Sequence, residues 1–374
     1  MDHLPRWYLH FLMASNLSNW IRLLKINKFR FRLSSLHRVV LITLVNVATF
    51  PLALAERAFV SWRLRHTQID HSPVFIVGFW RSGTSFLEGI LAKDPHFATI
   101  NKTEQLFPSY FLLHYPFIRW ISRLVFPRHR LSLTHNKTVD LEAPREEEFA
   151  IANLSPFSYY HILTFPDNYA YYTQLALFRD LPPETVRQWK STYRYLAKKI
   201  AFKNPGRRLL LKSPTNTCRM KELLGMFPNA RFVHIYRNPY DVIPSFYEIY
   251  QNMWAHFSLQ SKLTDYDPDD FQDFLMNFYK DFYHQYEQQK ESIPAERLVE
   301  ISYEALMEDP LSITRSIYES LKLPGFSELQ DQFETYLKSE KDYQPSQRKL
   351  DEKTRQKIGR YASDMLSHWG YGNY

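Results

Sequence analysis

Four short apolar runs, separated by long helical stretches, constrain the fold of this chain most strongly. They cover residues 74–77, 209–211, 231–236 and 297–301. Near-continuous apolar strands that alternate with helices are typical of a parallel sheet covered on both faces. We therefore expect an α/β fold, a phosphate-loop-like parallel sheet flanked by helices, with its ligand beyond the carboxyl ends of the strands.

A glycine loop follows the first run. Residues 78–85 read Gly-Phe-Trp-Arg-Ser-Gly-Thr-Ser and precede an expected helix at 86–93. The spacing of the two glycines fits a nucleotide phosphate loop, whose backbone N–H groups and helix N-terminus bind an anion. Such a loop normally carries a lysine after its second glycine, whereas Thr84 stands here and Arg81 lies inside the loop.

The ends of the next two runs carry cations. Lys212 ends the second run and Arg237 the third, and Ser245 follows eight residues later. A guanidinium group binds phosphate with two parallel hydrogen bonds. Because a cation stands where a magnesium-binding carboxylate is expected, the sequence predicts a phosphate-bearing nucleotide without metal-dependent hydrolysis.

These motifs resemble those of the sulfotransferase family. Residues 75–86 look like its 5′-phosphosulfate loop and residues 234–245 like its 3′-phosphate motif. Shorter matches lie at 210–215, 301–310 and 369–371, so the likeness covers roughly residues 72–374 and is closest to the broad subgroup with many bacterial members. The resemblance implies 3′-phosphoadenosine-5′-phosphosulfate as the sulfuryl donor, and no metal.

The resemblance also implies roles for single residues. Lys212 matches the catalytic lysine of the family. The expected donor-binding residues are Arg81, Ser82, Gly83, Thr84, Ser85, Arg237 and Ser245. Arg348, in a basic cluster near the C-terminus, is expected to close over the nucleotide.

The general base stays open between two carboxylate sources. Several family members place a histidine shortly after the lysine, but Asn216 stands in that segment here. Glu104 lies where the related tyrosine-modifying branch has its base, and we favour it. The alternative is the acidic run at 144–149, in which Glu146 and Glu148 are equal candidates, although such a run is often only a solvated helix start.

The N-terminal arm differs in composition from the rest of the chain. Residues 1–38 hold seven Lys and Arg against one Asp, and so account for most of the net charge of +8. Residues 39–55 then form a run of 17 without a charge, the lower limit for a spanning helix. We expect residues 1–57 to contact a membrane surface. A helix packed on the body and a true membrane anchor are the alternatives, and nucleic acid is not an expected partner.

The expected organisation is an arm at 1–71 and a sulfotransferase domain at 72–374, with a helical, aromatic-rich insertion at 105–200 as the acceptor region. Cys218 is the single cysteine, which excludes an internal disulfide and favours a reducing compartment. The predicted location is cytoplasmic and membrane-associated, with a membrane-anchored form as the alternative.

The predicted function is sulfuryl transfer to a hydroxyl of a lipid, sterol or other amphipathic acceptor. Three alternatives remain at this stage: a carbohydrate sulfotransferase, a kinase with a phosphate loop, and an inactive nucleotide-binding adaptor on membranes. The missing loop lysine argues against the kinase, and Lys212 beside two anion motifs argues against the adaptor.

Overall fold

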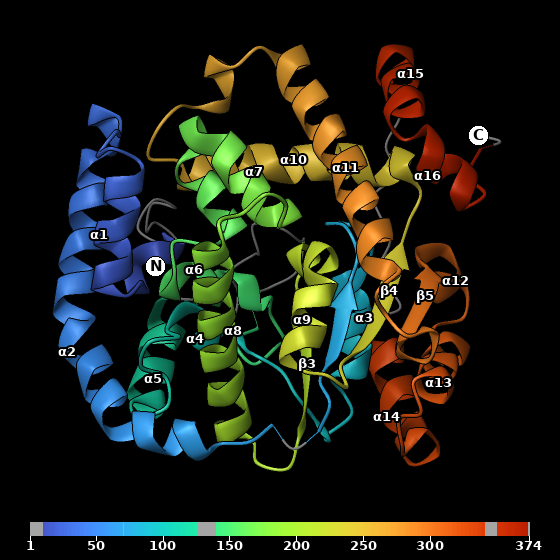
Figure 1. Cartoon of the computed structure of the whole chain (residues 1–374), viewed down its shortest axis with the longest axis horizontal. Helices are drawn as coiled ribbons and strands as arrows, with labels where there is room; N and C mark the ends of the chain where they lie inside the picture. Colours follow the sequence, from blue (N-terminus) through green and yellow to red (C-terminus); the bar gives the residue numbers. More distant parts are fainter. Residues whose placement is uncertain (1–9, 70, 126–139, 341–349, 373–374) are drawn as a thin grey trace. The chain divides into compact units, whose positions relative to one another are not determined.

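The computed structural model describes residues 10–69, 71–125, 140–340 and 350–372. The chain divides into two compact units, and Figure 1 labels their helices and strands. The first comprises Met1–Asp70, Thr99–Gly206 and Ile249–Asp265, and the second comprises His71–Ala98, Arg207–Glu248 and Tyr266–Tyr374.

The second unit holds a five-stranded sheet in the order β2-β3-β1-β4-β5, and every neighbouring pair is parallel. The strands are β1 (Val74–Val77), β2 (Phe97–Ala98), β3 (Arg208–Lys212), β4 (Arg231–Tyr236) and β5 (Leu298–Ser302). The α/β fold with a parallel sheet flanked by helices is thus confirmed. Strand β2 was not predicted, because two residues are too few to show a period.

Strand β1 lies at the centre of the sheet, and its alternating side chains enter two hydrophobic layers. Val74 and Ile76 belong to the layer that includes α3 (Thr84–Leu91), α13 (Pro310–Ser320) and α14 (Phe326–Ser339). Phe75 points to the opposite face, where its ring stacks on Phe232 and lies near Phe227. Burial on both faces explains why the strands read as continuous apolar runs.

The other helices of the second unit connect or follow the strands. They are η6 (Pro214–Arg219), α9 (Met220–Met226), α11 (Pro268–Lys290), η8 (Ala295–Arg297), α12 (Tyr303–Glu308), α15 (Glu352–Tyr361) and α16 (Ser363–His368). Helix α10 (Pro239–Phe257) contributes residues to both units.

In its described residues the first unit consists of helices and one isolated β-bridge between Asn101 and Pro144. Its α-helices are α1 (Leu17–Ile26), α2 (Leu36–His66), α4 (Lys102–Leu106), α5 (Tyr115–Val125), α6 (Glu147–Leu154), α7 (Tyr169–Leu177) and α8 (Pro183–Lys203). Its short 3-10 turns are η2 (Phe11–Ala14), η3 (Leu33–Ser35), η4 (Tyr159–Leu163), η5 (Pro166–Asn168) and η7 (Leu263–Asp265).

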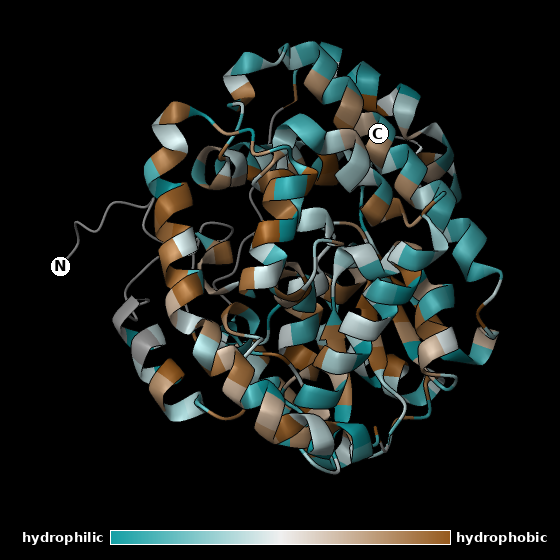
Figure 2. Ribbon diagram, turned by 60° about the vertical axis from the view of Figure 1, so that its left-hand side comes forward, coloured by the Kyte–Doolittle hydropathy of each residue, from teal (hydrophilic) through white to brown (hydrophobic). Residues whose placement is uncertain are grey.

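Helix α2 is longer than the apolar run that predicted it, with 31 residues and Pro51 in its interior. Within the described part of the chain, residues 33–66 form the one helix that is long and apolar enough to cross a membrane, by length and composition alone. Figure 2 brings this side forward and shows brown, hydrophobic segments along its helices. Only 22% of its most apolar window is buried inside the protein.

Candidate active site

The glycine loop joins β1 to α3, and both of its glycines are required by the backbone. Gly78 has φ 145° and Gly83 has φ 101°, which side chains rarely tolerate. A Cβ atom on Gly78 would lie 2.4 Å from the carbonyl oxygen of Ile235, and one on Gly83 would lie 2.4 Å from the ring of Tyr303. The loop is therefore pressed against the neighbouring strand end and the start of α12.

Arg81 is held inside this loop in a left-handed conformation, with φ 71°. Such a conformation is strained for a residue with a side chain and persists where its surroundings impose it. The Nε atom of Arg81 donates a hydrogen bond of 2.9 Å to the Oγ atom of Ser245 on α10. Arg237 donates to the carbonyl oxygen of Arg81 at 3.4 Å. Two cations and a hydroxyl group thus meet beside the loop.

Arg237 follows directly after β4, so the strand end fixes its position. Its guanidinium carbon lies 4.1 Å from the centroid of the Tyr303 ring, and Nη2 lies 3.3 Å from the Asp241 carboxylate. Stacking on an aromatic face orients the guanidinium plane and leaves its edge available for an anion.

Lys212, the last residue of β3, is buried, and its ammonium group reaches the same loop. Its Nζ atom donates to the Oγ atom of Ser85 at 3.2 Å and lies 3.5 Å from a carboxylate oxygen of Glu88. Glu88 is itself buried on α3. The sequence analysis missed Glu88, although an acid in an otherwise apolar helix was a signal for it.

Thr217 is a second residue that the sequence analysis missed. Its hydroxyl group accepts a hydrogen bond of 2.8 Å from the backbone N–H of Gly78, and it is fully buried in η6. A run of buried polar residues directly after Lys212 was the available signal. This contact ties the β3–α9 connection to the start of the glycine loop.

The other predicted donor-binding residues line the same loop. Ser82 and Thr84 are buried, Ser85 is exposed, and the hydroxyl group of Ser82 donates to the carbonyl oxygen of Phe79 at 2.8 Å. Arg348 lies outside the described residues.

The predicted general bases belong to the first unit. Glu104 is buried, its carboxylate accepts from the N–H of Asn101 at 3.0 Å in a capping box, and it pairs with Lys203. Glu146 accepts a hydrogen bond from the hydroxyl of Tyr160.

Glu148 is fully buried in α6. Its carboxylate accepts from the hydroxyl of Ser158 at 2.8 Å and from the backbone N–H of Tyr159 at 3.2 Å. These contacts tie α6 to η4.

Lys102 lies two residues before Glu104 in the chain and donates to the side chain of Gln105 at 3.0 Å. Burial, together with the charge of Arg145, lowers the pKa of Lys102 to about 7, while the charge of Glu146 opposes the shift. A lysine near neutrality at physiological pH is a candidate proton carrier, and the sequence analysis did not single it out.

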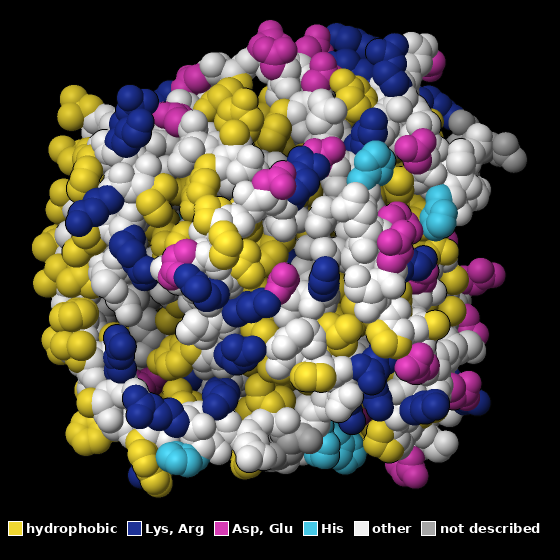
Figure 3. All heavy atoms as spheres, viewed as in Figure 1, with side chains coloured by type: hydrophobic (Ala, Val, Ile, Leu, Met, Phe, Trp, Pro, Cys, Tyr) yellow, Lys and Arg dark blue, Asp and Glu magenta, His cyan; other side chains and the backbone are white. Residues whose placement is uncertain are grey.

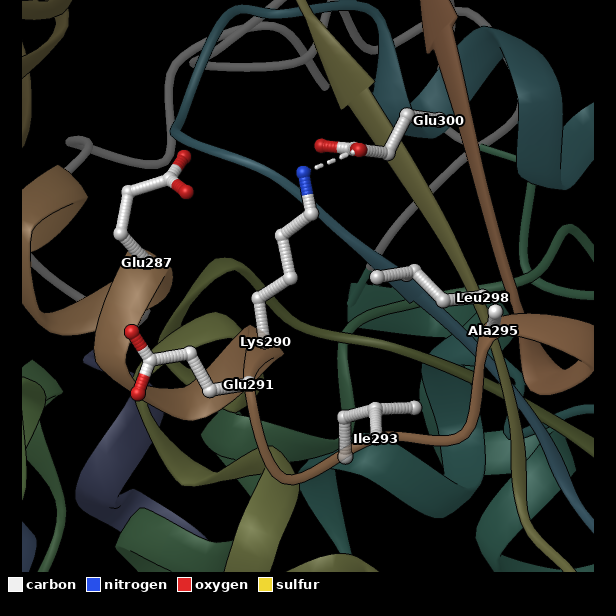
Figure 4. A pocket seen from close by; sticks show the side chains of 7 residues that line it. All are labelled: Glu287, Lys290, Glu291, Ile293, Ala295, Leu298 and Glu300. Carbon is white, nitrogen blue, oxygen red and sulfur yellow. Dashed lines mark hydrogen bonds and ion pairs between the residues drawn. The ribbon is translucent and has the colours of Figure 1, made fainter.

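A hollow of about 440 Å³ lies elsewhere in the second unit, beside β5 (Figure 4). Leu298 and Glu300 line it, and they lie at the amino end and the middle of that strand. Figure 4 shows Lys290 pointing at Glu300, with an ion pair between them. Burial raises the pKa of Glu300, but hydrogen bonds from His234, Lys290 and Tyr286 outweigh it and hold that pKa well below its usual range. Because the hollow lies beside the amino end and the middle of β5, whereas the glycine loop follows the carboxyl end of β1, we do not assign it to the candidate active site.

No group of three or more His, Cys, Asp or Glu side chains that could hold a metal ion occurs among the described residues. The cations at the sheet edge contact the hydroxyl groups of Ser85 and Ser245 and the backbone carbonyl of Arg81. Ammonium, guanidinium and hydroxyl groups are hydrogen-bond donors of the kind that an anionic ligand needs.

Comparison with known proteins decides the family. A model of the sulfotransferase family matches residues 73–328, which include the glycine loop, Lys212 and the Arg237 segment. The chain belongs to the sulfotransferase family. It is therefore an enzyme, a sulfotransferase, and the family resemblance of the motifs is confirmed.

Relatives cover nearly the whole chain. Proteins named omega-hydroxy-beta-dihydromenaquinone-9 sulfotransferase Stf3, from Mycobacterium bovis and Mycobacterium tuberculosis, are 29% identical over 98% of this chain and 93% of their own length. The match includes the N-terminal region that precedes the family match.

Two solved structures share the fold. The sulfotransferase STF9 of Mycobacterium avium superposes with a TM-score of 0.70 at 16% identity, covering 98% of this chain and 97% of its own. The sulfotransferase STF1 of Mycobacterium tuberculosis gives 0.62 at 16% identity, covering 94% of each chain.

Proposed function

We propose that this sulfotransferase takes its sulfuryl group from 3′-phosphoadenosine-5′-phosphosulfate and transfers it to a hydroxyl group of a lipid, sterol or other amphipathic acceptor. The observation that carries the donor assignment is the meeting of Arg81, Ser245 and Arg237 beside the glycine loop. A donor with a 5′-phosphosulfate and a separate 3′-phosphate needs two adjoining anion sites. The proposal involves no metal ion.

The residues fit these two anions in different ways. The loop offers backbone N–H groups at the start of α3 and the side chains of Arg81, Ser82, Thr84 and Ser85, with Gly83 at the helix cap. These groups suit the 5′-phosphosulfate. Arg237 and Ser245 suit the 3′-phosphate, because a stacked guanidinium group and a hydroxyl group hold an anion by directed hydrogen bonds. Arg348 as a residue that closes over the nucleotide stays a prediction.

The transfer forms a bond between the acceptor oxygen and sulfur and breaks the bond between sulfur and the 5′-phosphate oxygen. Lys212 supplies an ammonium group where negative charge develops on that leaving oxygen. In the structure this group is shared between Ser85 and Glu88. In this position the ammonium group of Lys212 is near the carboxylate of Glu88 and also contacts the glycine loop at Ser85.

A carboxylate accepts the proton of the acceptor hydroxyl as it attacks. We keep Glu104 as the proposed base and Glu146 as its alternative. Glu148 stays a second alternative: it is buried and hydrogen-bonded, as Glu104 is, so these contacts do not rank the two.

The proposed acceptor rests on composition and on a relative. The relatives' name specifies an ω-hydroxylated dihydromenaquinone, a lipid that carries a hydroxyl group. The segment at 105–200 is rich in aromatic residues that suit an amphipathic molecule, and we propose it as the acceptor region. We further propose a cytoplasmic enzyme whose residues 1–57 contact a membrane surface, where such an acceptor would be dissolved.

A transfer assay with ³⁵S-labelled donor tests this function. The protein is incubated with hydroxylated isoprenoid quinones, sterols and long-chain alcohols in one series and with mono- and oligosaccharides in another. Label in the organic extract, absent with Lys212→Ala, supports the proposal. Label on sugars and none on lipids would replace it by carbohydrate sulfation.

A further inference from the structure

Helix α2 presents an uninterrupted apolar stripe to solvent. Six large side chains on one face of the helix are at least 41% exposed, namely Leu36, Val40, Leu44, Val47, Leu54 and Trp62. Their spacing of three, four, seven or eight residues places them on the same side of the helix. Figure 3 shows hydrophobic side chains, in yellow, gathered along the left-hand edge, where Figure 1 draws α1 and α2.

The opposite face of α2 is buried and mixed in character: Val39, Ile42, Val60 and Leu64 pack there beside polar side chains that make specific contacts. Thr43 accepts a hydrogen bond of 2.9 Å from the indole N–H of Trp20. Asn46 donates to the backbone carbonyl of Leu12 at 3.1 Å. Glu56 and Lys199 form an ion pair with both side chains fully buried. The inner face of α2 is therefore already packed against the protein, and its outer face leaves a contiguous row of large apolar side chains exposed, which is typical of a surface that contacts another apolar phase.

These inner contacts decide whether α2 can span a membrane or only lie on its surface. The helix is tied to η2, α1 and α8 at Asn46, Thr43 and Glu56 along its length. A spanning helix would need lipid around its whole circumference, and the Glu56–Lys199 pair would then have to leave its shared protein burial. The geometry therefore favours a helix that lies in the plane of a membrane surface and exposes one face to it.

Positive charges before and after the apolar stripe indicate a membrane surface with anionic headgroups. No acidic residue occurs between Asp2 and Glu56. Exposed cations lie before the stripe, at Lys25, Lys28 and Arg30, and after its apolar centre, at Arg57, Arg63 and Arg65. Anionic headgroups attract cations at both ends. A second copy of the helix, packed face to face in either direction, would instead bring cationic ends together.

Helix α5 adds a second element beside α2. Ile118 of α5 packs in one cluster with Leu52 and Ala53 of α2. Phe117 and Trp120 of the same helix are 52% and 57% exposed. Exposed aromatic rings of this kind favour the headgroup level of a bilayer.

We propose that the outer face of α2, with its flanking cations and α5, docks the first unit in the plane of a leaflet that contains anionic lipid. This proposal specifies the membrane contact named under the proposed function, and its biological role rests on that function. Docking at the membrane surface would let a lipid acceptor reach the enzyme by lateral diffusion. The docking surface itself is independent of the donor-binding residues.

Vesicle co-sedimentation of the full chain tests the docking. The expected result is binding to vesicles of phosphatidylcholine with phosphatidylglycerol, and weaker binding to phosphatidylcholine alone. Leu44→Glu is expected to reduce binding about tenfold or more. Replacement of Arg57 and Arg63 by Gln is expected to reduce vesicle binding about fivefold per cation and to make the binding less dependent on salt concentration. Tyr169→Glu, an exposed aromatic on α7, is the matched control and should bind like the parent.

Three outcomes would contradict the proposed docking. The first is equal vesicle binding by the parent and Leu44→Glu. The second is retention of the protein in membranes after alkaline carbonate extraction, which would mean that α2 spans the bilayer, and the third is a dimer in solution that Leu44→Glu abolishes. Calorimetry with 3′,5′-adenosine bisphosphate on the same variants separates the two proposals. If the vesicle binding is absent but the nucleotide binds, only the docking proposal fails. If the protein binds vesicles but not the nucleotide, only the donor assignment fails.

Discussion

The Nε atom of Arg81, in the glycine loop, donates a hydrogen bond of 2.9 Å to the Oγ atom of Ser245 on α10. The two residues are 164 positions apart in the chain. The bond joins the loop expected to bind the 5′-phosphosulfate to the helix expected to bind the 3′-phosphate, so a change at one of these expected sites should also affect the other.

Ser245→Ala is expected to raise the KM for the donor about tenfold or more. A hydrogen bond to a charged group contributes about 1.5–3 kcal/mol, and the change removes one from Arg81 and one from the bound phosphate. Steady-state kinetics with varied donor measure the effect. Ser316→Ala is the control, since that hydroxyl group bonds only within its own helix, to Ile313. An unchanged KM would remove Ser245 from the donor site.

Lys212→Ala is expected to lower kcat by a factor of about 10²–10³, because a cation aimed at developing charge acts mainly in the transition state. Binding of 3′,5′-adenosine bisphosphate, which lacks the sulfuryl group, should change little. Single-turnover kinetics at saturating donor measure the effect. A large rise in KM with kcat unchanged would mean that Lys212 only binds the donor.

Gly78→Ala is expected to destabilise the fold by several kcal/mol, since its Cβ atom would lie 2.4 Å from a backbone oxygen. Gly206→Ala is the matched control: Gly206 also has a positive φ, of 74°, but nothing lies within 4 Å of the added atom. There the loss should be limited to about 1–2 kcal/mol. Urea unfolding compares the two, and equal losses would contradict the tight contact of the loop with β4.

Stability is expected to fall as the pH drops below 6.5, partly through His161. Burial lowers the pKa of His161 to about 4, against 6.5 in the unfolded chain, while its bond to the Ser155 carbonyl opposes the shift. Between these values the unfolded chain binds more protons, so unfolding becomes easier with acid, by about 2 kcal/mol at pH 5 for this group.

Urea unfolding at pH 7.5 and pH 5 measures this loss. The variant His161→Gln should lose less stability than the parent over the same interval, whatever its stability at pH 7.5. An equal loss in both proteins would show that other groups carry the acid sensitivity.

Glu104→Gln is expected to lower kcat by about 10²–10⁴ if it is the base. Because Glu104 also caps α4 and pairs with Lys203, the variant Lys203→Met serves as control for the structural part. Glu146→Gln tests the alternative in the same assay. Activity that survives in Glu104→Gln and is lost in Glu146→Gln would reverse the proposed order.

The sheet was predictable because its strands are buried on both faces and therefore read as apolar runs with strand ends at Gly78, Lys212 and Arg237. The first and third runs have the same bounds as β1 and β4, and the other two differ from β3 and β5 by one residue at each end. The helix after the loop begins at Thr84, two residues before the prediction, because Gly83 already caps it.

The residues that sequence analysis missed act through contacts distant in the chain. Thr217 reaches Gly78 across 139 positions, and Glu88 meets Lys212 only once α3 and β3 pack together. The pKa of Lys102 depends on burial and on Arg145. No local pattern contains such information, although each of these residues stood beside a motif that was recognised.

Calorimetric titration with 3′,5′-adenosine bisphosphate, with ATP as comparator, tests the central claim most directly. We expect tight binding of the bisphosphate, discrimination against ATP without a need for magnesium, and loss of binding in Arg237→Ala while that variant stays folded. Absence of binding, or a preference for ATP that depends on magnesium, would contradict the assignment of the glycine loop and Arg237 to this donor.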